Sequence, residues 1–130
     1  MPARRLLNEL SRRSLYAFTQ LAFRTLHPTQ KYYRNWHIET VAWHLEQVAK
    51  GDIRRLIIQL PPRHMKSLMA SVIFPAWVHG RNPSKRIITA SYSRDLSGKH
   101  ALDYKRLVNN QNYRTLFPRM KVAGGRNSAL

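Results

Sequence analysis

Residues 54–77 read RRLIIQLPPRHMKSLMASVIFPAW, and this stretch decides how the middle of the chain is expected to fold. The run Leu56–Leu60 is rich in branched apolar residues without polar alternation, which is typical of a strand buried on both faces. Pro61-Pro62 ends the run, because proline cannot donate to a strand ladder. A helix is predicted from Lys66, with Pro75 ending or kinking it; its apolar residues recur at helical spacing at Leu68, Met69, Val72, Ile73 and Ala76.

The flanking sequence adds three helices and a second strand. Helical spacing predicts one helix over Arg4–Leu26 and another over Trp36–Lys50, where Gly51 suits the position after the last turn. Residues 86–93, RIITASYS, resemble a second buried strand, and Asp95–Val108 is predicted to be helical. From Leu56 onward the order is therefore strand, loop, helix, strand, helix. That alternation predicts an α/β fold with parallel strands and right-handed crossovers.

The loop between the first strand and its helix has part of a phosphate-binding pattern. Lys66-Ser67 stands where a lysine for the β/γ-phosphates and a hydroxyl for Mg²⁺ are expected. The two glycines of that pattern are missing, because Leu60 and Met65 occupy their positions. An ordinary strand–helix loop with two turn prolines remains the alternative.

The same loop and its flanks resemble a known family. LPPRHMKSLMASVIFPAW is similar to the ATPase-motor segment of the large terminase subunit of tailed bacteriophages and prophages, and the resemblance runs from about Trp36 to Pro118. It implies a partial P-loop NTPase fold, with a basic helical segment at 1–35 and the ATPase domain at 36–118. The tail at 119–130 falls outside the resemblance and is expected to be disordered.

The resemblance also implies roles for individual residues, with ATP and Mg²⁺ as cofactors. Lys66 would pair with the β/γ-phosphates, Ser67 would ligate Mg²⁺, and Arg63 would act catalytically on the γ-phosphate as a cis arginine finger. Pro62 would stiffen the loop, while backbone N–H groups from His64 to Ser67 would cradle the phosphates. The alternatives are a solvated lysine at a helix start and an arginine on an exposed loop.

Two further features of the site follow from the resemblance. Met65 stands where most members have glycine, and it would cost about 1 kcal/mol if that position needs a positive φ. Trp36 and His37 are expected to contact the adenine, with Gln30 as a weaker candidate. A buried tryptophan beside a histidine in the first helical turn is the structural alternative for this pair.

The acidic residues are too few for an evident hydrolytic centre. The sequence has six Asp and Glu residues, and none forms the strand-end pair that would complete the Mg²⁺ site and activate water. We therefore expect inefficient ATP hydrolysis by this chain alone. The resemblance implies a truncated terminase subunit, whose acidic strand and nuclease domain would lie beyond the end of the chain.

The charge balance favours polyanionic partners. Across 130 residues, 23 Lys and Arg against 6 Asp and Glu give a net charge of +17, while 43% hydrophobic residues suffice for a core. The absence of cysteine excludes disulfides and thiol chemistry. No apolar run approaches the length of a membrane span, although a membrane-surface N-terminal helix stays open.

The expected partners follow from the charge and the resemblance together. Double-stranded DNA is expected as a partner in the cytoplasm of a bacterial host. For an intact family member, the small terminase subunit, the portal protein and a homo-oligomeric ring are implied as well. The alternative function is a non-enzymatic basic module that binds DNA or RNA. A fragment of a helicase or of another ATPase is a third possibility, against which the Pro-Pro-Arg loop argues.

Overall fold

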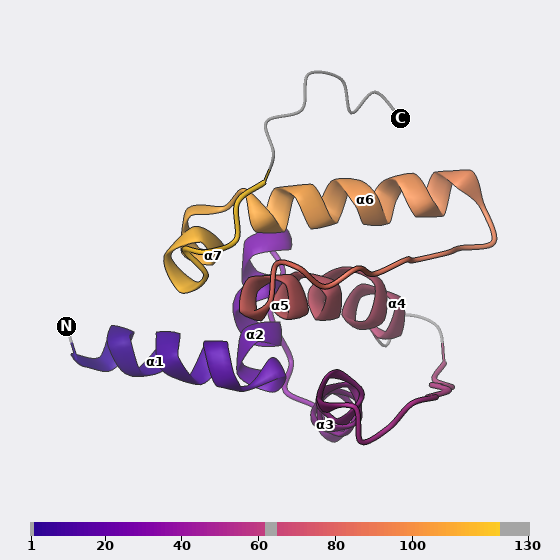
Figure 1. The fold of residues 1–130 in the computed structure, drawn as a ribbon, viewed down its shortest axis with the longest axis horizontal. Helices are drawn as coiled ribbons and strands as arrows, with labels where there is room; N and C mark the ends of the chain where they lie inside the picture. Colours follow the sequence, from indigo (N-terminus) through magenta and orange to yellow (C-terminus); the bar gives the residue numbers. More distant parts are fainter. Residues whose placement is uncertain (1, 62–64, 123–130) are drawn as a thin grey trace.

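A computed structural model describes residues 2–61 and 65–122, and these residues form a helical assembly (Figure 1). Helices α1 (Pro2–Arg13), α2 (Leu15–Leu26) and α3 (Trp36–Lys50) come first. A continuous helical stretch follows, made of α4 (Lys66–Leu68), the π-helical η1 (Met69–Ile73) and α5 (Phe74–Arg81). Helices α6 (Arg94–Val108) and α7 (Gln111–Leu116) complete the described part.

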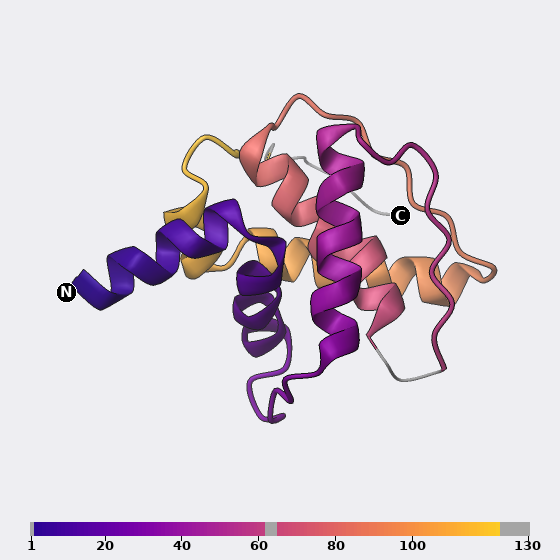
Figure 2. The same cartoon turned by 90° about the horizontal axis from the view of Figure 1, so that it is seen from below.

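The predicted α/β fold with parallel strands is wrong. Neither Leu56–Leu60 nor residues 86–93 contains a strand, and the described residues contain no sheet. Both segments run as open chain between helices (Figures 1 and 2). The physical reason is that a β-strand needs a neighbouring strand. Branched residues favour an extended backbone, but the hydrogen bonds of the ladder must come from that neighbour.

The predicted helices are confirmed, with one correction. Instead of a single helix over Arg4–Leu26, the chain breaks at Ser14, whose side chain accepts a hydrogen bond from the Ala17 N–H at 3.3 Å and so caps α2. Because of this break, α1 lies crosswise to α2 (Figures 1 and 2). Gly51 ends α3 with a φ of 87°, as expected for a glycine after a last turn. The helix that starts at Lys66 runs past Pro75 to Arg81, with π-helical turns just before the proline.

The core is built around α2. Its buried residues Leu15, Phe18 and Ala22 pack with apolar side chains from α3, η1, α5, α6 and α7. Two large buried side chains have their polar groups paired: the Tyr113 hydroxyl donates to the Ala76 carbonyl at 2.6 Å, and the Trp77 indole N–H donates to the Ser11 carbonyl at 3.2 Å. The core therefore fixes the start of the α4–α5 stretch relative to α2 and α3, where the predicted site residues lie.

No helix in residues 2–61 and 65–122 combines the length and apolar character needed to cross a membrane.

Candidate functional site

The chain enters the α4–α5 stretch through a strained residue. Met65 precedes the helix with φ 64° and ψ 6°, the left-handed conformation that glycine favours. It is the non-glycine residue with positive φ among those the structure describes. The sequence leaves open whether this position needs a positive φ, and it does: a methionine occupies a position for which glycine is suited. Holding it there costs about 1 kcal/mol.

Lys66 reaches back across the loop from the first helical position. Its Nζ donates a hydrogen bond to the Leu60 carbonyl oxygen at 2.9 Å, and the group is partly buried. The ammonium group is therefore held between the end of the open segment and the helix start. The N–H groups of a first helical turn have no partner within their own helix, so they and the ammonium group provide positive charge at one place.

The remaining loop residues are only partly placed. Pro62, Arg63 and His64 lie outside the described residues, so their predicted roles have no geometry here. Ser67 is exposed in the first turn of α4, one residue beyond Lys66. Its hydroxyl forms no hydrogen bond with another residue in the described ranges, so it is open to solvent.

A cavity of about 660 Å³ lies beside Met65. It brings together residues from the end of α2, the connection to α3, the first turn of α3 and the start of the α4–α5 stretch. Two of the predicted adenine contacts, Gln30 and His37, line it together with Met65. Its other lining residues are Phe23, His27, Lys31, Tyr32, Tyr33, Asn35, Ile38 and Leu68. Aromatic side chains and the amides of Gln30 and Asn35, beside the start of α4, suit a planar base with a phosphate chain.

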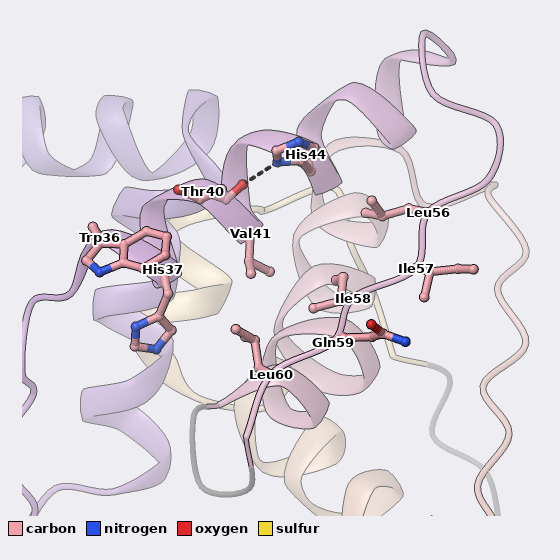
Figure 3. A pocket seen from close by; sticks show the side chains of 10 residues that line it. All are labelled: Trp36, His37, Thr40, Val41, His44, Leu56, Ile57, Ile58, Gln59 and Leu60. Atoms are coloured by element: carbon pink, nitrogen blue, oxygen red, sulfur yellow. Dashed lines mark hydrogen bonds between the residues drawn. The ribbon is translucent and has the colours of Figure 1, made fainter.

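Trp36 lies at a different cavity. That space, of about 200 Å³, is bounded by one face of α3 and by the open segment Leu56–Leu60 (Figure 3). Trp36 is 78% exposed there, and its ring stands perpendicular to the His37 ring with centroids 6.3 Å apart. The predicted pair is therefore divided: His37 lines both cavities, whereas Trp36 does not line the one that contains Gln30.

Tyr32 is a cavity residue that sequence reasoning missed. Its hydroxyl is buried beside Tyr16, and its ring packs edge-on against Phe23 with centroids 5.4 Å apart. Burial, followed by the neighbouring Tyr16, raises the pKa of Tyr32 to about 12. The hydroxyl faces Tyr16 of α2 and not the cavity, so the part that Tyr32 offers to a ligand is the ring that lines the cavity. The tyrosine pair in HPTQKYYRN was the only sequence signal for it.

A hydrogen bond between Arg34 and Tyr16 holds the segment that carries Tyr32. The Arg34 Nε donates to the Tyr16 hydroxyl at 2.9 Å, and this hydrogen bond raises the pKa of Arg34. The contact ties the connection between α2 and α3 back to α2, so it helps to hold the segment that carries Gln30 and Tyr32.

The carboxylates of the described residues lie elsewhere. None lines the cavity beside Met65, and no group of three or more His, Asp or Glu residues within residues 2–61 and 65–122 is arranged to hold a metal. Glu9 pairs with Arg12 and Arg13 in α1, Glu46 accepts from the Leu15 N–H at 2.7 Å, and Asp103 is buried in α6.

A scan of protein-family models and searches of curated proteins and of solved structures find no match for this chain.

Proposed function

We propose that this chain binds ATP with Mg²⁺ at the Lys66 loop, as the nucleotide-binding part of a DNA-packaging motor related to the large terminase subunit. The observation that carries the proposal is the arrangement at the helix start: a left-handed Met65, then Lys66 with its ammonium group 2.9 Å from the Leu60 carbonyl. A short loop closed by its own lysine is suited to receive phosphate oxygens in place of that carbonyl. The proposal depends on this loop and the adjoining cavity, and it needs no sheet.

Each part of the nucleotide has a proposed contact. Lys66 takes the β/γ-phosphates and Ser67, exposed one residue later, takes the Mg²⁺ ion. The base enters the cavity beside Met65, against the aromatic wall and Gln30. Arg63 remains proposed for the γ-phosphate on the family resemblance alone.

Binding is proposed without efficient hydrolysis. Water activation needs a carboxylate near the γ-phosphate, and no Asp or Glu of the described residues lines the cavity beside Met65. Glu9 pairs with Arg12 in its own helix, and Glu46 accepts from the Leu15 N–H of α2. The chain is accordingly proposed to hold ATP and to depend on other parts of a motor for turnover.

A titration with a fluorescent ATP analogue and Mg²⁺ tests the site. Lys66→Ala removes a charge-assisted hydrogen bond to phosphate, so affinity is expected to fall about tenfold or more. Lys99→Ala, which removes the same charge from an exposed position of α6, should bind like the wild type. Circular dichroism checks that both variants keep their helices. Absent binding in the wild type, or equal binding in both variants, would remove the nucleotide site.

A second candidate function is nucleic-acid binding without a nucleotide. It is favoured by the net charge of +17 and by exposed cations such as Arg54, Arg55 and Arg119, which pair with no carboxylate among the described residues. Basic side chains without carboxylate partners are available to phosphates. A packaging motor also binds double-stranded DNA, so charge alone does not separate the two candidates.

A further inference from the structure

Residues 86–92, the open segment ahead of α6, expose one side of an extended chain. Ile88 is 96% exposed and Tyr92 is 94% exposed, four residues apart. The alternate residues Ile87, which is half-buried, and Thr89, which is exposed, line a cavity of about 330 Å³ against η1, α5 and α6. Side chains that alternate between two sides are the pattern of an extended strand, and here the outward side is apolar as well.

The backbone of this segment is held at its ends and unpaired between them. At the start, His79 bonds through Nε2 to the Lys85 carbonyl at 3.1 Å and through Nδ1 to the Tyr104 hydroxyl at 2.6 Å. At the end, the Ser93 side chain caps α6 by accepting from the Leu96 N–H at 3.1 Å. Between these points, residues 86–92 make no backbone–backbone hydrogen bond with any residue in the described ranges. Such a row of unsatisfied groups is a template for another chain.

The charges beside the segment indicate what kind of chain it would take. Lys85 and Arg86 precede the apolar positions, Arg94 follows them, and all three are exposed. A second copy of this protein would bring the same cations against these, which is unfavourable for like charges. A partner with carboxylates at the ends of its strand would complement them.

We propose that residues 86–92 are a docking edge for an extended segment of an acidic partner protein. The partner segment is apolar at alternate positions, carries Asp or Glu at both ends, and adds to this edge through main-chain hydrogen bonds. Ile88 and Tyr92 supply the apolar contacts, while Lys85, Arg86 and Arg94 select the acidic ends. The proposal uses no residue of the nucleotide site and stands or falls separately from it.

The test uses the whole chain and a labelled peptide of alternating valine and threonine with two acidic residues at each end. Fluorescence anisotropy should show saturable binding that weakens with added salt, whereas a peptide with lysine ends should not bind. Ile88→Glu should lower the affinity about tenfold, since it removes an apolar contact and adds a like charge. Leu102→Glu, at a position of α6 that is 58% exposed, makes the same charge change and should bind like the wild type.

Amide hydrogen exchange locates the peptide, with protection expected within residues 86–92 when it is bound. Unchanged exchange there, or equal affinities for the Ile88→Glu and Leu102→Glu variants, contradicts the proposal. So does a dimer of the chain alone that sedimentation detects in the wild type and not in Ile88→Glu, because the edge would then serve a second copy.

Discussion

Met65 has a backbone conformation that a side chain makes costly, and this gives a prediction at the level of one residue. At φ 64° glycine has no Cβ to clash, whereas alanine does. Both Met65→Gly and Met65→Ala remove the packing of the methionine side chain. The difference between their free energies of unfolding therefore reports the cost of a side chain at this positive φ. We expect the glycine variant to be more stable than the alanine variant by about 1 kcal/mol in chemical denaturation. An alanine variant of equal or greater stability would mean that φ is negative at this position.

The conformation or position of some site residues could be predicted from the sequence, because it depends only on residues nearby in the chain. Lys66 and Met65 act through the few residues between Leu60 and the helix start, so the strain at Met65 was foreseeable from the missing glycine. Tyr32 was not foreseeable in this way. Its buried hydroxyl depends on how the connection after α2 folds back against Phe23 and Tyr16 of α2, and no local pattern encodes that packing.

At the scale of elements, α5 and the end of α7 approach so closely that only glycine fits between them. A Cβ on Gly80 would lie 2.5 Å from Cδ2 and 2.8 Å from Cδ1 of the Phe117 ring, which is itself held by Phe18 and Tyr113. Gly80→Ala should therefore destabilise the fold by about 1–3 kcal/mol, because the ring must shift.

Gly98 provides the matched control. It lies within α6, and a Cβ added there would meet no neighbouring atom within 4 Å, so Gly98→Ala should stabilise the protein by about 0.5–1 kcal/mol through helix propensity. Thermal or urea unfolding followed by circular dichroism measures both changes. If both variants shift stability in the same direction, the close approach of α5 and Phe117 is not supported.

Helices and strands differed in how far the sequence could predict them. The helix Trp36–Lys50 needs only its own apolar spacing and Gly51, and the structure has it over the same residues. The break at Ser14 was missed because its capping bond competes with an otherwise continuous helical pattern. Leu56–Leu60 has the composition of a buried strand, yet its ladder partners would have to come from elsewhere. Composition predicts a preference for extended backbone and not the presence of a neighbour.

At the scale of the whole molecule, helices far apart in the sequence, α1 and α7, are in contact. Arg12 in α1 donates from Nε to the Leu116 carbonyl at the end of α7, at 2.7 Å. The cavity beside Met65 likewise joins the connection after α2 to the start of α4. Long-range contacts of this kind decide where a cavity opens, which is why the sequence could name Gln30, Trp36 and His37 as candidates but could not tell that Gln30 and Trp36 line different cavities.

The net charge gives the last prediction, and it distinguishes the two candidate functions. With a charge of +17, binding to a short DNA duplex should weaken steeply with salt, with a slope of log K against log salt of about −4.5 or steeper, which corresponds to about five phosphates or more. Anisotropy titrations at several NaCl concentrations measure the slope.

Repeating them with ATP and Mg²⁺ asks whether the nucleotide site and the DNA-binding surface are linked. If the chain belongs to a packaging motor, ATP should change the DNA affinity of the wild type and leave that of Lys66→Ala unchanged, because coupling requires an occupied site. An equally steep slope that ignores ATP in both proteins favours the basic nucleic-acid-binding module, and a slope near zero contradicts a polyanionic partner for either function.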